Sequence, residues 1–404
     1  MTQFAERIDV MANEVVKLNS LAGSITAGDM VSLAVGAPAV EAYPIDTLRE
    51  ISQDVFQNSA RGVEALKYGS TYGFTRLREA VRDILLAPRG LNADVENIMI
   101  TSGGIQPMSL MSQLFIDPGD TILVETPSFV HASMVFKMFE ANLVPCAMDD
   151  NGLVTEDVEE KIKKYNPKMI YTIPTFQNPT GVTMSLERRK KLAQLASRYD
   201  VIVLEDDPYR EIRYSGEHLP YIKSFDTTGN VVLANSFSKI FSPGSRLGYI
   251  VADPKILKHL ADIKLAVDTC ANTISQALVS EFFLRGCYPT HLKKLCDMYR
   301  SRRDVMLESL DRYFPEGTKH TRPDGGFYVW AQLPGSLDAS ALSEEIAKKL
   351  NICYGLGSAF YTEGNPEGAG RNCMRLNFSS LTEDVIRNSI KKLGDFFKSK
   401  LQDN

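Results

Sequence analysis

The sequence predicts an α/β protein with a large domain on a mainly parallel sheet and a smaller α+β domain. The chain has 404 residues, which is longer than one average domain. From about residue 70 to residue 255, short β-branched runs alternate with amphipathic helical patterns, as in a parallel sheet covered by helices. A long helical pattern over Phe282–Phe314 then leads to a region that mixes strands and helices.

Local patterns predict the individual elements. Apolar residues recur at helical spacing from Leu77 to Leu85, and Gly90 stands where a helix stop is expected, so one helix ends near Arg89. Pro289 fits a position that starts or kinks the long helix. Short apolar runs predict strands at Asn97–Thr101, Thr121–Glu125, Lys168–Ile173, Val201–Glu205, Val231–Asn235, Arg246–Val251, Gly326–Leu333 and Met374–Phe378. Two further helices are predicted over Ala339–Leu350 and Glu383–Leu401.

Composition limits the classes of function. The chain has 45 basic and 50 acidic residues and a net charge of −5, which argues against nucleic acid as a partner. Six cysteines occur without a CxxC pair or a nearby histidine cluster, so we expect no metal site and free thiols in the reducing cytoplasm. Charged residues interrupt the N-terminal region, and no apolar run reaches the roughly 18 residues of a membrane span. We therefore expect neither export nor a membrane partner.

Polar or glycine-containing segments follow five of the predicted strands. In open α/β sheets, ligands bind at the carboxyl ends of the strands. These segments should therefore meet at one ligand site: Ser102–Gln106, Thr126–Phe129, Pro174–Gly181, Asp206–Tyr209 and Ser236–Lys239.

Lys239 is the first candidate for chemistry. It closes a polar segment after an apolar strand, and Arg246 follows seven residues later. Burial and a neighbouring cation both lower the pKa of a lysine amine, which frees it to attack an aldehyde. Ser236, Ser238 and Arg246 could hold a phosphate beside it. The alternative is an ordinary surface lysine, and its position alone does not decide between the two.

Asp206 and Tyr209 suggest that the ligand beside such a lysine contains a pyridine ring. An acidic group ends the Val201–Glu205 strand, and a tyrosine follows three residues after Asp206. A carboxylate at a pyridine nitrogen keeps that nitrogen protonated, so the ring can accept the electrons left when a substrate Cα loses its proton. Tyr209 could hydrogen-bond the phenolic oxygen of the same ring. The alternative is a strand-ending acidic turn with no chemical role.

Together these segments resemble the class I/II aminotransferases, which are pyridoxal-phosphate enzymes of fold type I. The resemblance covers most of the chain, and its motifs occur in the family's order: Asn178–Gly181, Asp206–Tyr209, Ser236–Lys239 with Arg246, and Met374–Asn377. Ile173–Gln177 before the first motif and Phe241–Gly244 after the lysine are most similar to the 2-aminoadipate, kynurenine and multi-substrate aminotransferases.

The resemblance implies that pyridoxal 5′-phosphate is held on Lys239 as a Schiff base. Lys239, once displaced by the substrate amine, would move the proton between the substrate Cα and the cofactor. The resemblance also implies Asp206 at the pyridine nitrogen, with Asn178 and Tyr209 at the phenolic oxygen. Asp207 stays open as the alternative to Asp206, although the three-residue step to Tyr209 favours Asp206.

The family's phosphate site would combine backbone amides at a strand-to-helix turn with nearby side chains. Amides at a helix N-terminus favour anions, and small residues let a phosphate approach the backbone. The implied residues are Gly103, Gly104, Ile105, Ser236, Ser238 and Arg246. Many relatives carry a polar residue at the position of Ile105, so only its backbone is assigned. Phe129 matches the aromatic residue that stacks on the cofactor ring, although core packing is its alternative role.

Three further residues match the family's substrate and subunit contacts. Arg375 resembles the arginine that binds the substrate α-carboxylate, a task that suits a planar bidentate donor, and a salt-bridged edge residue is its alternative. Gly36 matches the glycine beside that carboxylate. Tyr68 matches a tyrosine that reaches the cofactor phosphate of the neighbouring subunit, which implies a homodimer with intersubunit active sites. A solvated loop tyrosine is the plain alternative.

The implied activity is transfer of an amino group from an L-amino acid to a 2-oxo acid, such as 2-oxoglutarate, with ping-pong kinetics. A C–S lyase on the same scaffold and a non-catalytic regulator are the alternatives. A regulator would carry an added DNA-binding domain, and the 35 residues before Gly36 lack the basic helix pair of such a domain.

The sequence also suggests a donor class and a domain division. Relatives that accept acidic side chains can draw an arginine from an N-terminal helix, whereas Val10–Ser20 offers only Lys17. Neutral aliphatic or aromatic donors are therefore favoured, and 2-aminoadipate stays possible. We expect a cofactor-binding domain over residues 47–288, with residues 1–46 and 289–404 forming the small domain.

Overall fold

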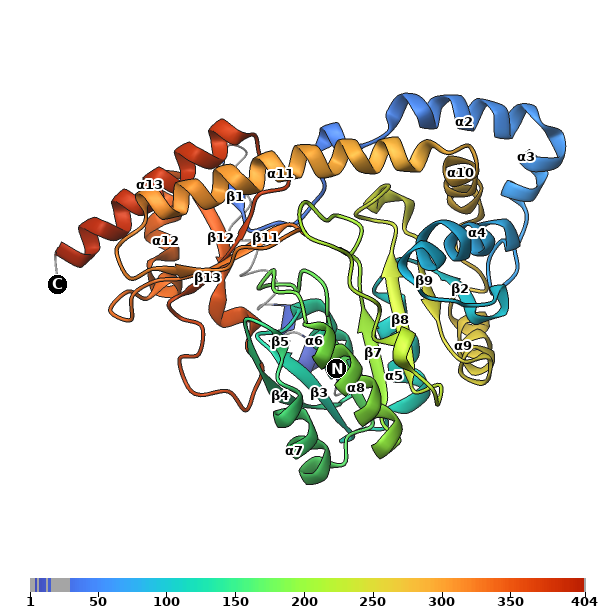
Figure 1. Cartoon of the computed structure of the whole chain (residues 1–404), viewed down its shortest axis with the longest axis horizontal. Coiled ribbons are helices and arrows are strands. Elements are labelled where there is room, and N and C mark those ends of the chain that lie inside the picture. The colour runs from blue at the N-terminus through green and yellow to red at the C-terminus, as the bar shows by residue number, and fades with distance from the viewer. Residues whose placement is uncertain (1–3, 6, 12–13, 16–29, 403–404) are drawn as a thin grey trace.

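The computed structural model describes residues 4–5, 7–11, 14–15 and 30–402, which contain two separate β-sheets (Figure 1). The larger sheet has eight strands in the order β2-β9-β8-β7-β6-β3-β4-β5, and the smaller has five in the order β1-β12-β13-β11-β10. The strands are β1 (Val31–Leu33), β2 (Ile98–Thr101), β3 (Thr121–Thr126), β4 (Asn142–Asp149), β5 (Gly152–Leu153), β6 (Met169–Thr172), β7 (Ile202–Asp206), β8 (Val231–Ser236), β9 (Gly248–Val251), β10 (Lys319–His320), β11 (Tyr328–Gln332), β12 (Ile352–Leu356) and β13 (Cys373–Asn377).

The centre of the large sheet is parallel, as the sequence predicts. Strands β8, β7, β6, β3 and β4 run parallel to one another, whereas β9 runs antiparallel to both β8 and β2, and β5 runs antiparallel to β4. The strand predicted from Arg246 begins only at Gly248, because residues 243–245 form a 3-10 turn and Arg246 has a left-handed backbone with φ of 49°. Strand β4 was not predicted, since Asn142–Asp149 has little β-branched character.

Helices surround both sheets. They are α2 (Ile45–Gln57), α3 (Ser59–Leu66), α4 (Thr75–Ala80), α5 (Gln106–Phe115), α6 (Val130–Met138), α7 (Thr155–Tyr165), α8 (Leu186–Tyr199), α9 (Pro254–Val267), α10 (Thr273–Leu284), α11 (Cys287–Tyr313), α12 (Ala339–Leu350) and α13 (Glu383–Gln402). Apolar side chains of α5, α6 and α9 share one core cluster with the large sheet, and those of α7 and α8 share another. Because the two clusters use alternate residues of the same strands, both faces of the sheet are covered.

One predicted helix ends where expected, near Arg89, and a second helical pattern differs from the structure. The pattern before Gly90 forms α4, which continues as a π-helical turn (Val81–Leu86) and a 3-10 turn (Ala87–Arg89) before Gly90 ends it with φ of 76°. The long pattern from Phe282 is two helices rather than one, because Gly286 adopts φ of 70° between α10 and α11. Pro289 lies in the first turn of α11, where a missing N–H costs nothing, so it starts the helix and does not kink it.

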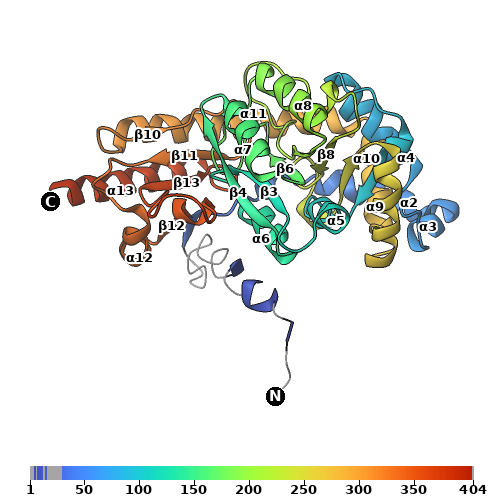
Figure 2. The same ribbon diagram turned by 90° about the horizontal axis from the view of Figure 1, so that it is seen from below.

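The small sheet joins a strand from the N-terminal part of the chain to the C-terminal part. Strand β1 pairs in parallel with β12, which pairs antiparallel with β13. Helix α11 extends from the large sheet to the small one and packs against α13 (Figures 1 and 2). The division into domains at residues 47 and 289 stays a prediction.

We expect Gly394→Ala to destabilise the protein by about 1–3 kcal/mol, because the helices α11 and α13 approach too closely for a side chain there. A Cβ on Gly394 would lie 2.2 Å from the backbone oxygen of Tyr313. Urea unfolding at a fixed protein concentration measures the effect. Gly335→Ala is the control, since a Cβ there meets nothing within 4 Å and should change stability by less than about 0.5 kcal/mol. Equal effects of the two substitutions would contradict this view of the helix contact.

Candidate active site

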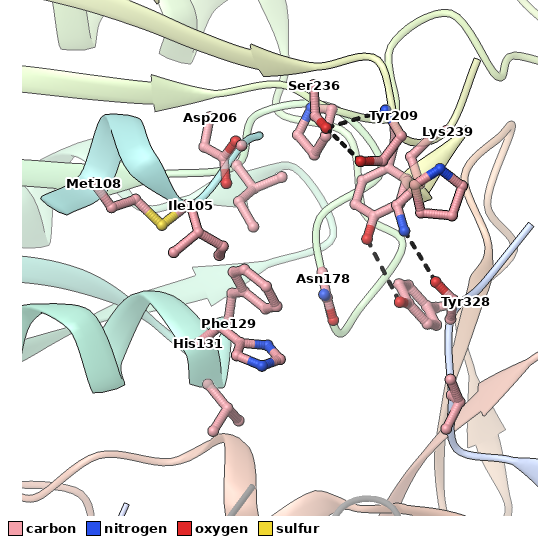
Figure 3. Close-up of a pocket in the computed structure, with 18 of the residues that line it drawn as sticks. Ile105, Met108, Phe129, His131, Asn178, Asp206, Tyr209, Ser236, Lys239 and Tyr328 are labelled. Carbon is pink, nitrogen blue, oxygen red and sulfur yellow. Dashed lines mark hydrogen bonds between the residues drawn. The ribbon is translucent and has the colours of Figure 1, made fainter. Parts of the chain in front are cut away.

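A cavity of about 470 Å³ lies where the large-sheet strands end and the small sheet begins (Figure 3). Twelve of the residues selected from the sequence line it: Gly36, Gly104, Ile105, Phe129, Asn178, Asp206, Tyr209, Ser236, Ser238, Lys239, Arg246 and Arg375. Gly103 lies against the side chain of Arg246 at its edge. Tyr68 does not line the cavity, and its side chain is 86% exposed.

Lys239 reaches the cavity from the turn that follows β8. Its Nζ atom donates a hydrogen bond to the backbone oxygen of Gly36 at 3.0 Å. Burial lowers the pKa of the amine, and the nearby guanidinium groups of Arg375 and Arg246 lower it further, against an opposing effect of Tyr328. A lower pKa increases the uncharged, nucleophilic fraction of the amine at neutral pH.

Asp206 and Asp207 point to opposite sides of the strand end. Asp206 is the last residue of β7 and lines the cavity, where it accepts a hydrogen bond from the Tyr171 hydroxyl at 2.8 Å. Asp207 is buried on the other side, 2.5 Å from Arg210 Nε and 3.2 Å from the Thr175 hydroxyl. Because successive side chains of a strand alternate in direction, only the first of the two carboxyls faces the cavity.

The carboxyl of Asp206 has a raised pKa of about 7. Burial is the main cause, and the negative charges of Asp207 and Glu125 add to it, while the hydrogen bond from Tyr171 opposes it. A cationic group placed beside Asp206 in the cavity would favour its ionised form. The site can therefore bind a protonated heterocyclic nitrogen.

The turn between β2 and α5 is shaped to receive an anion. Gly103 has φ of 83°, and a Cβ on it would lie 2.6 Å from Arg246 Nη2. A Cβ on Gly104 would lie 3.1 Å from the Cβ of Ser236. The Ser236 hydroxyl is 2.9 Å from that of Ser238. Backbone amides at the start of a helix, two hydroxyls and one guanidinium are the donors that phosphate groups use in proteins.

A partly buried polar cluster holds this turn on the side away from the cavity. Asp268, just after α9, accepts hydrogen bonds from the Ser102 hydroxyl at 2.6 Å and from Gln106 Nε2 at 2.7 Å. Its other oxygen lies 2.6 Å from Nζ of Lys264, a fully buried side chain. The conformation of the turn is thus tied to a helix that the sequence analysis did not connect with the site.

Arg375 on β13 is held on three sides but keeps free donor capacity. Its Nη1 donates to Asn178 Oδ1 at 2.8 Å and its Nη2 donates to the Ala34 backbone oxygen at 2.6 Å. Its guanidinium lies 4.4 Å from the ring centre of Tyr328 and 4.8 Å from that of Phe360. Its buried Nε finds no partner among the described residues. A positioned guanidinium of this kind suits a ligand carboxylate.

Tyr328 is a site residue that the sequence analysis missed. Its hydroxyl is 3.5 Å from that of Tyr209, and a Cβ on Gly36 would lie 1.7 Å from it. Burial raises the pKa of Tyr328, but the positive charges of Arg375 and Lys239 outweigh burial and lower it overall. The pairing of β11 with β13, which places Trp330 opposite Arg375, brings Tyr328 here, and local sequence patterns do not show that pairing.

Other missed residues complete the walls. Met108, Val130, His131 and Phe360 line the cavity. Behind them, Gln177 Nε2 donates to Glu125 at 3.1 Å and to the Pro127 backbone oxygen at 2.9 Å, which links the loop before Phe129 to the loop of Asn178. The described residues contain no cluster of three or more His, Cys, Asp or Glu side chains arranged to bind a metal ion.

Comparisons with known proteins agree on one family. A family model described as aminotransferase class I and II matches residues 28–393. An aromatic-amino-acid aminotransferase of Thermococcus litoralis is 39% identical, with 99% of this chain and 95% of that protein covered. A kynurenine aminotransferase structure from Pyrococcus horikoshii, in complex with PMP, is 39% identical, with a TM-score of 0.91 and coverage of 98% and 97%. The α-aminoadipate aminotransferase LysN of Thermus thermophilus, complexed with N-(5′-phosphopyridoxyl)-L-leucine, is 30% identical, with a TM-score of 0.86 and 97% of both chains covered.

The two neighbouring aspartates should respond differently to replacement by asparagine. The folded-state pKa of Asp206, about 7, lies above its usual value of 3.8, so its stabilising contribution is present below pH 4 and is lost as the pH rises through 7. In ligand-free protein, Asp206→Asn should therefore raise the free energy of unfolding above that of wild type by about 2 kcal/mol at pH 5 and about 4 kcal/mol at pH 8. Urea unfolding at both pH values measures this.

Asp207→Asn is the matched comparison. It removes the partner of the buried Arg210 and should cost about 3–5 kcal/mol at pH 8. If Asp206→Asn destabilises the ligand-free protein as much as Asp207→Asn at pH 8, the two side chains do not differ as described.

Proposed function

The chain belongs to the class I and II aminotransferases, and we propose that it moves the amino group of a neutral L-amino acid to a 2-oxo acid, such as 2-oxoglutarate, by a ping-pong mechanism. Its fold is fold type I of the pyridoxal-phosphate enzymes, and its cofactor is pyridoxal 5′-phosphate. The observation that carries the proposal is that a buried lysine amine, Lys239, shares one cavity with the carboxyl of Asp206 and the guanidinium of Arg375.

The residues present fit this cofactor. A Cβ on Gly103 or Gly104 would crowd Arg246 or Ser236, so glycine lets this turn approach those two side chains closely, which supports an assignment of the phosphate to this turn. We assign the phosphate to the amides of Gly103, Gly104 and Ile105 and to Ser236, Ser238 and Arg246. We assign Phe129 to the ring face, Asp206 to the ring nitrogen, and Asn178 and Tyr209 to the phenolic oxygen. When bound, the ring accepts the electron pair that the substrate Cα keeps after losing its proton.

Lys239 has two roles in this proposal. Its amine, with a pKa lowered by burial and by neighbouring arginines, holds the cofactor covalently and is then free to take the proton from the substrate Cα and return it. Asp206 stabilises positive charge at the ring nitrogen. Arg375 orients the substrate by its α-carboxylate beside Gly36, so that the Cα–H bond faces Lys239.

The cavity favours a donor with a neutral side chain. Its cationic lining residues are Lys239, Arg246 and Arg375, and the proposal uses all three for the cofactor and the α-carboxylate. Apolar residues form much of the remaining wall, including Ile105, Met108, Val130 and Phe360. The names of the relatives, which include aromatic amino acids and kynurenine, agree with this class. Lys17, the only N-terminal cation considered for acidic donors, lies outside the described residues, and 2-aminoadipate remains a second candidate because LysN is similar.

We expect purified wild-type protein with pyridoxal 5′-phosphate to absorb visible light and to bleach when an L-amino acid is added without an oxo acid. Leucine, methionine and phenylalanine should bleach it faster than glutamate or 2-aminoadipate. Lys239→Ala should convert at least about 10³-fold more slowly, because it lacks the base. Addition of 2-oxoglutarate should restore the wild-type colour. A protein that binds the cofactor but is never bleached would refute amino transfer, and release of sulfide and pyruvate from cysteine would favour a lyase.

We also propose that the protein works as a cytoplasmic homodimer with Tyr68 at the partner's cofactor. Tyr68 is almost fully exposed and lies two residues after α3, whose apolar side chains Val63 and Leu66 are also exposed. Phe56 on the adjoining α2 is 47% exposed. Such a concentration of exposed apolar side chains is typical of a protein interface.

No helix in the described part of the chain has the length and hydrophobicity to cross a membrane.

Leu66→Asp should shift the protein from a dimer of two 44.9-kDa chains toward monomer and weaken cofactor binding, because it places a charge in the proposed interface. Sedimentation and a cofactor titration measure the two effects. Tyr165→Asp is the control, since Tyr165 is 38% exposed on α7, far from α3 in Figure 1. A wild-type protein that is monomeric and fully active would overturn the dimer and the role of Tyr68.

A further inference from the structure

His131 is a polar residue in the cavity that the proposed chemistry leaves unused. It is the second residue of α6 and follows Phe129 by two positions. Its ring centre lies 5.4 Å from that of Phe129, at an angle of 57°. Figure 3 shows both rings pointing into the cavity. The imidazole makes no hydrogen bond within the part of the chain that the structure describes, so its two nitrogen atoms are available to a ligand.

The surroundings of His131 are mostly apolar. Val130 and Phe360 belong to one buried cluster, against which Trp330 packs. The backbone N–H of Ser128 donates to the Phe360 oxygen at 2.9 Å, which joins this wall to the segment that carries Phe129. An aromatic or long aliphatic side chain would bury its carbon atoms here, and the imidazole is a polar group within an apolar wall. A ligand that lacks a polar partner for His131 loses one hydrogen bond relative to a ligand that has one.

The charge state of His131 limits the kind of partner it can take. Burial lowers the pKa of the imidazole, and the positive charges of Arg375 and Lys239 lower it further. The start of α6 also disfavours a positive charge on its second residue. Among other titratable groups near this wall, Lys137 on the same helix is paired with Glu14 and Glu363. A neutral imidazole donates or accepts a hydrogen bond but gives no ion pair to a side-chain carboxylate.

We propose that His131 is a specificity-determining residue that recognises a neutral hydrogen-bonding group, such as a phenol or aryl amine, on an aromatic substrate side chain. This inference rests on the proposed function, because it assumes that Arg375 holds the α-carboxylate of the same ligand. It deepens that function by assigning the side-chain class: aromatic donors with a polar ring substituent bind better than unsubstituted ones. It also explains why substrates with acidic side chains would bind less well at neutral pH, since a neutral imidazole forms no ion pair with a carboxylate.

The test uses two carboxylates that lack the amino group and so bind without reacting. They are 3-(4-hydroxyphenyl)propanoate and 3-phenylpropanoate, which differ only in the phenol oxygen. Dissociation constants are measured by spectral titration of the cofactor-loaded protein at pH 8. Wild type should bind the hydroxylated ligand about 3- to 10-fold more tightly, which is the usual net effect of one hydrogen bond.

Two variants separate hydrogen bonding from ring packing. His131→Phe keeps an aromatic ring and should bring the ratio of the two dissociation constants to within about twofold of unity. His131→Gln keeps a donor and an acceptor and should retain most of the preference. In both variants, 3-phenylpropanoate should bind within about threefold of its wild-type affinity. The ratio of kcat/KM for tyrosine over phenylalanine should change in the same direction as the binding ratio.

Each outcome has one meaning for His131. Equal weakening of both ligands in His131→Phe would show that His131 only positions Phe129 and would overturn the inference. A wild-type preference that survives in His131→Phe, or no wild-type preference, would also overturn it. Failure of the proposed function is seen separately, as absence of bleaching by any amino acid, and it does not alter the ratio for the two unreactive carboxylates.

Discussion

The site depends on burying ionisable side chains that have few hydrogen bonds and no counter-ion. Lys239 has one hydrogen bond, to a backbone oxygen, and two arginines nearby that disfavour its charge. Asp206 has one neutral partner, the Tyr171 hydroxyl. Such groups cost folding free energy, because a buried ion without a counter-ion is poorly solvated. A ligand that carries a cationic nitrogen and a carboxylate would bring opposite charges to Asp206 and to Arg375, so part of its binding free energy would come from groups that the protein alone holds unfavourably.

The side chains behind the site have more partners than those that face it. Asp207 lies against Arg210, whose guanidinium also lies 3.6 Å from the ring centre of Tyr221. Arg189 is fully buried and donates to the backbone oxygens of Met184 and Pro174. These partners fix the loops that begin where β6 and β7 end. Asp206 is therefore held by a rigid strand end and cannot turn away to reach water, which a flexible loop would allow.

Sequence reasoning could predict the site where local patterns determine position. Lys239 and Asn178 follow β-strands and Asp206 ends one, and the strands of a parallel sheet bring their carboxyl ends to one edge. The choice between Asp206 and Asp207 required the strand register, since one residue of slip exchanges the two faces. Tyr328 and Asp268 were missed because they reach the site through contacts between segments more than 100 residues apart, namely with Tyr209 and Ser102. His131 carries no local signal, because a single histidine after a predicted strand fits many roles.

The two halves of the site depend on different parts of the chain. The residues assigned to the cofactor come mostly from the strand ends of one sheet, in which β6, β7, β8 and β9 lie side by side in chain order. The proposed carboxylate site needs the small sheet, in which β1 pairs with β12 across more than 300 residues. Ala34 and Gly36, just after β1, accept the hydrogen bonds of Arg375 and Lys239. Closing so long a loop is entropically costly, and the pairing of β1 with β12, the burial of Leu33 and these two hydrogen bonds offset that cost. In the proposed assignment, the large sheet therefore organises cofactor binding, whereas substrate orientation requires β1 to be joined to the C-terminal part of the chain.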